Sequence, residues 1–173
     1  MELSAPEKLM ILMICDIAKG DKSKYETDFD FIEAAILDDQ EWAIPYRYER
    51  LGKFTLPPDV IEILELLDSW RFIEWSIQKL ESKQSDQLKN DYFSITFEGF
   101  DGNEEPEEMR IAKFIIHKLG GFEEFKGRSL NSHQRRIDYY RRIRDEELRY
   151  RDQLGEGYDY EILNKVFKNA KYG

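Results

Sequence analysis

His133, the last residue of the phrase Asn131-Ser132-His133, is the side chain in this sequence best suited to proton transfer. We predict that it lies in the first turn of a helix capped by Asn131 or Ser132, where the helix dipole disfavours a charged imidazolium. A neutral histidine at that position could accept or donate a proton. The alternative is a histidine that only fixes its loop by hydrogen bonds.

Arg128 lies five residues before His133 and gives the spacing Arg-x4-His. This spacing resembles the catalytic motif of the HEPN ribonucleases, which are also small helical domains. The resemblance implies a histidine that helps to activate a ribose 2′-hydroxyl for attack. Arg128 and His133 are therefore the candidate catalytic residues of one hypothesis, in which the protein is a metal-independent ribonuclease or an RNA-binding protein.

A basic segment surrounds this motif, since residues 126–151 hold nine Lys/Arg and four Asp/Glu. At about 100° per residue, Arg135, Arg142 and Arg149 would fall within about 40° of one another on a helix, with Tyr139 beside them. Such a face could contact phosphates while the tyrosine stacks on bases. The interleaved acids offer an alternative, which is a salt-bridged, solvated face or ion pairs with the acidic N-terminal half.

The phrase at residues 97–103 combines glycines with short polar side chains. Asp101 and Asn103 can bond their own loop backbone or cap a helix that begins near Glu104, which would make the phrase a structured turn. Alternatively, these three residues could form an oxygen-rich cluster for a divalent cation. The alternating acids of a calcium loop are absent, so we expect no metal site. Asp101, Asn103 and Asn131 join the arginine face as candidate binding residues.

Composition limits the classes of function. The net charge is −10, and residues 1–86 alone carry 10 Lys/Arg against 19 Asp/Glu. An acidic protein is a poor general binder of nucleic acid, because phosphate contacts supply most of that affinity, so RNA is a partner to consider only through the local basic segment.

A single cysteine, Cys15, allows no intrachain disulfide and fits a reducing cytoplasm. Two histidines and one cysteine give no zinc spacing, no cofactor is expected, and no apolar run is long enough to cross a membrane.

Ser4 and Glu7 form a capping box that predicts a helix ending near Gly20. Residues 9–14 are apolar on every side of that helix. A helix of this kind must be covered all round, so we expect it to lie centrally or at a contact between subunits.

The rest of the chain also reads as helical, and its 41% apolar and 14% aromatic residues are enough for a core. We expect an all-α, multi-helical fold of about six helices in two packed subdomains, residues 1–85 and residues 86–173, that form one compact unit. Beyond the first helix, the patterns predict helices over about 31–37 (capped by Asp28 or Asp30), 57–81, 104–119, 131–150 and 159–167. They also predict a loop over 82–96 that could contain one helical turn.

Four segments, in this order and spacing, resemble the YfbU family of bacterial proteins. They are residues 3–9 (Leu-Ser-x-x-Glu-x-Leu), 97–101 (Phe-x-Gly-Phe-Asp), 131–133 (Asn-Ser-His) and 140–143 (Tyr-Arg-Arg-Ile). The resemblance covers most of the chain. It implies a multi-helical fold in two subdomains and a tendency to self-associate. It carries over no catalytic residue, because none is established for the family.

The leading hypothesis is a cytoplasmic bacterial protein that self-associates and acts through protein contacts, without established catalysis. It rests on the excess of apolar helical surface at residues 9–14 and 60–80. The ribonuclease or RNA-binding hypothesis is the alternative. A third hypothesis is a small-molecule pocket between the subdomains, lined by Trp70, Trp75 or Tyr140.

Overall fold

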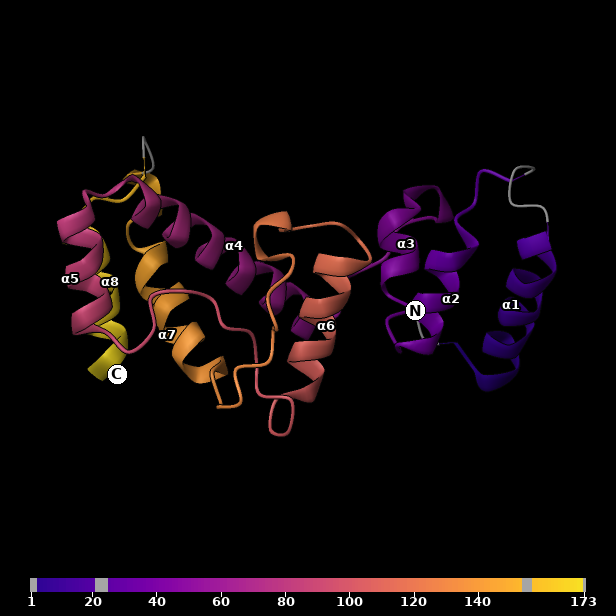
Figure 1. Ribbon diagram of the computed structural model, residues 1–173. Coiled ribbons are helices and arrows are strands. Elements are labelled where there is room, and N and C mark those ends of the chain that lie inside the picture. The colour runs from indigo at the N-terminus through magenta and orange to yellow at the C-terminus, as the bar shows by residue number, and fades with distance from the viewer. Residues whose placement is uncertain (1–2, 21–24, 154–156, 173) are drawn as a thin grey trace.

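The computed structural model describes residues 3–20, 25–153 and 157–172. Within these residues the chain is helical and has no strand, which confirms the all-α prediction (Figure 1). The eight α-helices found there are α1 (Ala5–Ala18), α2 (Phe29–Leu37), α3 (Ala43–Arg47), α4 (Pro58–Lys79), α5 (Ser82–Asp91), α6 (Pro106–His117), α7 (Ile137–Leu148) and α8 (Tyr160–Tyr172), and the 3₁₀ turns are η2 (Glu49–Leu51), η3 (Glu123–Phe125) and η4 (Arg151–Gln153).

The first two helices begin where their capping residues predict. The backbone N–H of Ser4 donates to the Glu7 carboxylate at 2.8 Å, which completes the capping box of α1. Asp28 caps α2, because its Oδ1 accepts from the backbone N–H of Phe31 at 3.1 Å. Local chemistry alone is sufficient to start both helices.

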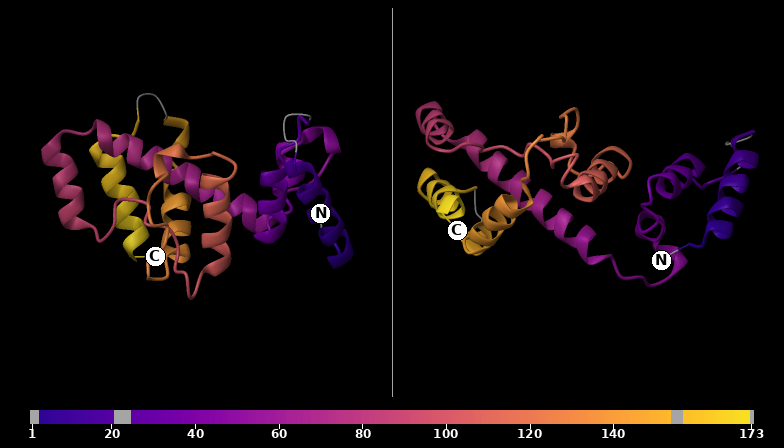
Figure 2. Two further views of the ribbon diagram at one scale, coloured as in Figure 1. Left: turned by 45° about the vertical axis from the view of Figure 1, so that its right-hand side comes forward. Right: turned by 90° about the horizontal axis from the view of Figure 1, so that it is seen from below.

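Helix α4 is a long central helix of 22 residues (Figure 2). Helices α6 and α7 pack along it, α8 packs on α7 and α4, and α5 packs on α8. Helices α1, α2 and α3 lie at the opposite end from α5 and α8, with α1 against α2. The two ends meet at Phe114 of α6, whose ring centroid lies 5.8 Å from that of Phe31 and 6.3 Å from that of Trp42. The division of the chain after residue 85 stays a prediction; that boundary falls inside α5, and α4 packs on helices of the second half.

Aromatic rings fill the centre of the core. Trp70 of α4 is fully buried and its ring lies 5.1 Å from that of Tyr140 on α7 and 6.3 Å from that of Phe167 on α8. The Tyr140 ring also contacts Phe97 and Phe100 of the loop between α5 and α6. The same rings therefore bury the face of α4 and fix the path of a loop.

The loop predicted over residues 82–96 is wrong for its first part, where ten residues form α5. A capping box starts this helix, since the N–H of Glu81 donates to the Gln84 side chain at 3.3 Å. Leu88 is the buried residue of α5, and the rest of its surface is polar. A helix that buries so little has no apolar periodicity, so the pattern alone cannot reveal it.

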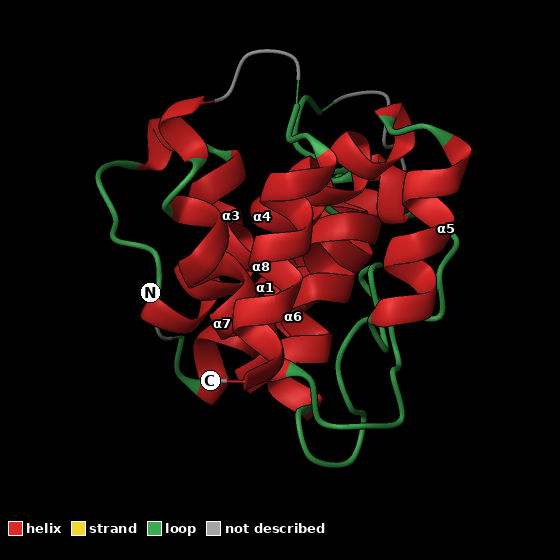
Figure 3. Cartoon of the chain, turned by 90° about the vertical axis from the view of Figure 1, so that its left-hand side faces the viewer, coloured by secondary structure: helices red, strands yellow, loops and turns green. Residues whose placement is uncertain are grey.

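The helix predicted from residue 131 begins later, at Ile137, and ends at Leu148. Leu130 and His133 have positive φ angles (54° and 53°), which a helix start cannot contain. His133 is therefore outside the helix, and the dipole argument for its neutral form does not apply. Residues 131–136 instead run beside the loop between α5 and α6, which the bridge between Phe100 and Asn131 aligns with them. Figure 3 shows loops of this kind around the packed helices.

None of the helices in the described ranges is both long and apolar enough to cross a membrane.

Candidate functional site

The two phrases singled out in the sequence lie against each other. The Phe100 N–H donates to the Leu130 carbonyl at 3.2 Å, and the Ser132 N–H donates to the Phe100 carbonyl at 3.1 Å. The side-chain oxygen of Asn131 accepts from the Gly102 N–H at 3.2 Å. We call residues 97–105 and 128–137 together the loop junction.

Gly99 allows the two loops to approach this closely. A Cβ atom at this position would lie 2.2 Å from the carbonyl carbon of Leu130, and its φ angle is +86°. Both observations exclude any other residue without a shift of the backbone.

The polar side chains at residues 101–103 are used within their own turn. The Asp101 Oδ1 atom accepts from the N–H of Asn103 at 2.7 Å and from that of Glu104 at 3.3 Å, and the Asp101 side chain is buried. This is an Asx turn that leads towards α6. Across the described residues, no group of three or more His, Cys, Asp or Glu side chains is arranged to hold a metal ion.

Two buried glutamates close the loop junction. Glu105 accepts from the Asp101 N–H at 2.9 Å with one oxygen, and from the N–H groups of Arg136 and Ile137 at 2.8 and 2.6 Å with the other. It therefore caps α7 from a distant part of the chain. Glu74 of α4 accepts from the Phe97 N–H at 2.7 Å. The sequence signal for Glu74 is a lone acid within the apolar band of a long helix.

Arg128 is held by Glu74 and is not an open cation. Its guanidinium donates to both carboxylate oxygens, at 2.8 and 2.6 Å, and to the Phe97 carbonyl at 3.0 Å. The hydrogen bonds that Arg128 donates to Glu74 raise the pKa of Arg128 above its ordinary value, so the guanidinium stays charged. His133 is exposed, and its backbone N–H donates to the Asn131 side chain at 3.1 Å. Among the described residues, no hydrogen bond or ion pair joins the side chains of Arg128 and His133.

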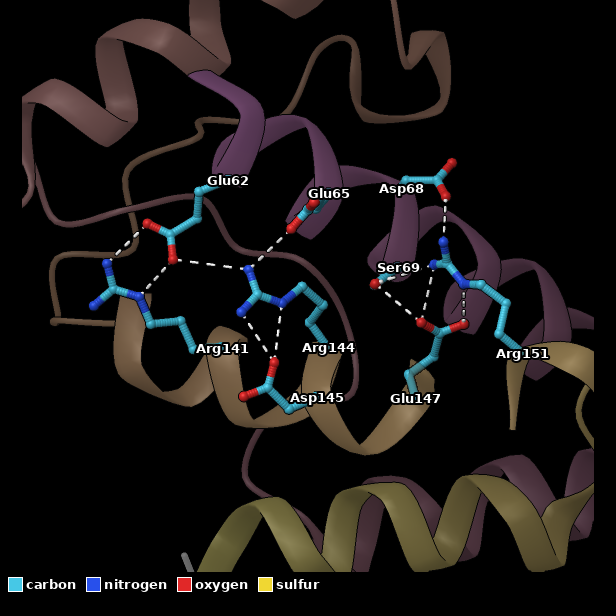
Figure 4. A network of polar contacts seen from close by, with 9 residues as sticks. All are labelled: Glu62, Glu65, Asp68, Ser69, Arg141, Arg144, Asp145, Glu147 and Arg151. Atoms are coloured by element: carbon cyan, nitrogen blue, oxygen red, sulfur yellow. Dashed lines mark hydrogen bonds and ion pairs between the residues drawn. The ribbon is translucent and has the colours of Figure 1, made fainter. Parts of the chain in front are cut away.

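Three arginines of the basic segment face an acidic strip of α4 (Figure 4). The strip consists of Glu62, Glu65 and Asp68, and the arginines are Arg141, Arg144 and Arg151. Arg141 donates to both oxygens of Glu62, at 2.7 and 2.8 Å. Arg144 lies 3.3 Å from Glu65 and 2.9 Å from Asp145. The segment is basic in sequence, but carboxylates of the same molecule neutralise these arginines.

Glu147 marks the buried end of this network (Figure 4). Its carboxylate is fully buried and accepts from Ser69 Oγ at 3.0 Å, from the Tyr158 hydroxyl at 2.5 Å and from Arg151 at 2.9 Å. Burial, with the hydrogen bond to Glu147, raises the pKa of Tyr158, so the phenol stays protonated as a donor. Each oxygen of this buried charge has partners, as stability requires.

The three arginines predicted to share one face are not equivalent. Arg135 precedes α7, so the helical angle does not apply to it, and it pairs with Asp138 at 3.0 Å. Arg149 is exposed and pairs with Glu146 at 2.9 Å. Arg142 differs from both, because its Nε donates to the Ala170 carbonyl at 2.7 Å and no carboxylate of the described residues pairs with it.

The tryptophans and Tyr140, considered as pocket residues, separate into two groups. Trp70 and Tyr140 are fully buried in the core. Trp75 is partly exposed and lines, with Phe72 and Gln78, a surface pocket of about 400 Å³ on α4. Of the three residues, Trp75 is therefore the one that a ligand could reach.

A family model described as the YfbU domain matches residues 3–167 of the 173 residues. The chain belongs to the YfbU family. The resemblance seen in the sequence is thereby confirmed. A comparison with curated proteins found no match.

In this YfbU domain the two phrases lie at one place because of long-range contacts. The backbone bridge between Phe100 and Asn131 aligns them, and the Glu98 N–H donates to the Tyr140 hydroxyl at 3.0 Å. Arg136 binds the Glu98 carboxylate at 2.6 Å. These contacts hold the two loops in one conformation, and this structural role explains the residue types in both phrases.

Gly99→Ala should lower the free energy of unfolding by about 3 kcal/mol or more, because the added methyl group meets the Leu130 backbone and the φ angle is unfavourable. Gly120→Ala is the matched control, since Gly120 also has a positive φ angle (+73°) but open space around it. We expect about 1–2 kcal/mol for that control. Urea unfolding followed by circular dichroism measures both values, and equal losses would contradict the close approach of the two loops.

Glu62→Gln should lower the free energy of unfolding at pH 7 by about 1 kcal/mol, because it weakens a partly exposed charged pair. The hydrogen bonds from Arg141 hold the pKa of Glu62 below its ordinary value of 4.5. The stabilisation is therefore fully present above pH 4.5 and is lost as the pH falls through the pKa of the folded state.

Urea titrations of wild type and Glu62→Gln at neutral and acidic pH measure this effect. The difference in unfolding free energy should shrink on acidification. A difference that grows as the pH falls would show that the pKa of Glu62 is shifted in the other direction. Glu65→Gln is the control, because the Glu65 side chain is more exposed (56%) and pairs only at 3.3 Å with Arg144.

Proposed function

We propose that this YfbU domain is a self-associating protein-interaction module whose contact surface is helix α1. The observation that supports the proposal is a stripe of five large apolar side chains on α1. They are exposed by 55% to 79%, and they are Leu9, Met10, Met13, Ile14 and Ile17. We call these residues the α1 stripe.

The α1 stripe is one face of a helix whose other face is covered. Residues 9, 10, 13, 14 and 17 span about 140° around the axis at about 100° per residue. Cys15 and Ala18, which lie outside that arc, are buried, and α1 packs mainly on α2. The apolar sequence of α1 predicts that other protein surface covers the helix on every side. In the described part of a single chain, only the side that contains Cys15 and Ala18 is covered.

Two lysines, one in α1 and one directly after it, reinforce this division. Lys8 pairs with Asp39 at 3.2 Å and also with Glu41, and Lys19 pairs with Glu33 at 2.6 Å. These contacts draw the lysines towards the covered side. The α1 stripe itself contains no charged residue, as an apolar contact surface requires, and the exposed Asp16 lies about 20° beyond its edge.

A second copy of the chain is a suitable partner for this surface. Two α1 stripes related by a two-fold axis present the same apolar side chains to each other, so the contact is complementary to itself. Helix α1 is about 21 Å long, by 1.5 Å per residue, and places the contact towards the small end of stable interfaces. We therefore expect an association that depends on concentration in the micromolar range.

The proposal places the protein in a bacterial cytoplasm. The single cysteine, Cys15, is buried in the contact between α1 and the rest of the molecule. Burial raises the pKa of its thiol, which favours the protonated and unreactive form. A reduced, packed cysteine fits a reducing compartment.

The ribonuclease alternative has less support than self-association. It requires Arg128 and His133 to act together in an open, positive groove. Arg128 is instead held by both oxygens of Glu74, and His133 is exposed in a segment outside α7. The charge that the motif requires of Arg128 is therefore already engaged by Glu74.

Replacing Met13 and Ile17 together by Glu should convert a self-associating wild type into a monomer, because each copy would bring charges into an apolar contact. Size-exclusion chromatography with light scattering over the micromolar range measures the mass. Leu148→Glu is the control, since Leu148 is an exposed apolar residue on α7, outside α1. Circular dichroism shows that each variant is folded.

A wild type that stays monomeric throughout the micromolar range would end the proposal. So would an oligomer of unchanged mass after the double substitution, because the contact would then lie elsewhere.

A further inference from the structure

A second surface, remote from the α1 stripe, has the chemistry of a ligand site. It is a pocket of about 300 Å³ formed where α7 and α8 meet the segment that follows α5. We propose that this pocket binds a nucleoside phosphate, with the base on its aromatic side and the phosphate on its arginines. The pocket is lined by Tyr92, Phe93, Arg136, Tyr139, Arg142 and Lys171, and we call it the C-terminal pocket.

The charge of the C-terminal pocket is opposite to that of the protein as a whole. The lining has three cationic side chains and no carboxylate, in a chain of net charge −10. Glu98 pairs with Arg136 at 2.6 Å, whereas Arg142 has no carboxylate partner among the described residues. The positive charge of Arg142 therefore favours an anion in the pocket.

Arg142 supplies the main argument for a phosphate. The other arginines of α7, Arg141 and Arg144, are engaged by carboxylates, whereas Arg142 pairs with none in the described part of the chain. Its Nε donates to the Ala170 carbonyl at 2.7 Å, which fixes the plane of the guanidinium. The remaining donors of a fixed guanidinium match the oxygens of a phosphate.

Phe93 supplies the argument for an aromatic group. Phe93 is 78% exposed, whereas phenylalanine side chains are most often buried. The Arg136 guanidinium carbon lies 4.8 Å from the ring centroid. An exposed ring backed by an arginine is a surface on which a nucleobase can stack.

The second aromatic wall is rigid. The Tyr139 hydroxyl donates to the Ser94 carbonyl at 3.0 Å, and burial raises the pKa of this phenol, so it remains a neutral donor. The Arg136 side chain, 11% exposed, has a buried Nε with no hydrogen-bond partner among the described residues. The site is thus largely preformed, and the donors open to a ligand are those of Arg142, because the Arg136 Nε is itself buried.

A purely structural role explains part of this arrangement. Arg142 contacts the last turn of α8, where a cation stabilises the helix dipole. That role uses one N–H group of Arg142 and does not require the exposed ring of Phe93. The combination of the two, on the same pocket, is what favours a ligand.

Size and charge favour a single nucleotide unit over a long strand. A pocket of about 300 Å³ is at the lower end of the range for small-molecule sites. A polyanion would also meet the net charge of −10 beyond the pocket. The unit could come from a free nucleoside monophosphate or from a nucleotide of a short RNA, and these two sources can be separated by experiment.

Isothermal titration calorimetry with the full chain tests the proposal. The ligands are AMP, UMP, adenosine, inorganic phosphate and a short single-stranded RNA. Each is titrated into wild type, Phe93→Ala, Arg142→Gln and Arg149→Gln. Arg149→Gln is the matched control, because it removes the same charge from the same end of the molecule at an exposed residue outside the pocket.

We expect AMP or UMP to bind at least about tenfold more tightly than adenosine or phosphate alone, because each of these lacks one half of the recognised unit. Phe93→Ala and Arg142→Gln should each weaken binding by about tenfold, and Arg149→Gln should leave it within about twofold. Binding of the RNA with the same dependence on both residues would support the site and identify a strand as the source.

No binding of any nucleotide at millimolar concentration would overturn the proposal. Equal weakening by Arg142→Gln and Arg149→Gln, with no effect of Phe93→Ala, would also overturn it, since nonspecific charge would then explain the binding. Circular dichroism of Arg142→Gln checks that α8 is intact, and Phe93→Ala keeps the test valid if it is not, because the Phe93 side chain is largely exposed. Neither outcome depends on the oligomeric state.

Discussion

Three glutamates, Glu74, Glu105 and Glu147, are buried in the core, and each receives hydrogen bonds from segments distant in the chain. A buried carboxylate without partners would cost several kcal/mol, so the partners of all three must be in place together. Glu74 fixes Arg128 and the loop at Phe97. Glu105 and Glu147 do the same for the start and the end of α7. The orientation of α7 on α4 depends on these three charges.

The same requirement explains which parts of the fold could be predicted from the sequence. The starts of α1 and α2 depend on side chains three residues from the cap, so local patterns located them. The start of α7 depends on Glu105, about thirty residues away, whose carboxylate replaces a local cap. Helix α5 was missed for a different reason, because it buries Leu88 and little else. Helix starts that depend on local capping residues could be predicted from the sequence. A helix start capped by a distant residue, and a helix that buries few side chains, could not.

The candidate site was limited in the same way. The sequence singled out Arg128 and His133 by their spacing, but the partner that determines the chemistry of Arg128 is Glu74, 54 positions earlier. The predicted arginine face likewise assumed one continuous helix, and Arg135 lies before α7 begins. The proximity of the two phrases could not be derived from either one alone, since it follows from the approach of Gly99 to the Leu130 backbone.

Ion pairs within the molecule determine which arginine side chains can still bind an outside partner. The acidic strip of α4 engages Arg141, Arg144 and Arg151, and Glu74 engages Arg128, so these side chains have little capacity left for an outside partner. Arg142 is turned away from α4 towards the end of α8, where its described partner is a carbonyl and not a carboxylate. The apolar α1 stripe lies at the opposite end of the molecule. Because α1 and α8 lie at opposite ends of the molecule (Figure 1), the proposed ligand and the proposed second copy of the chain would not compete for one surface.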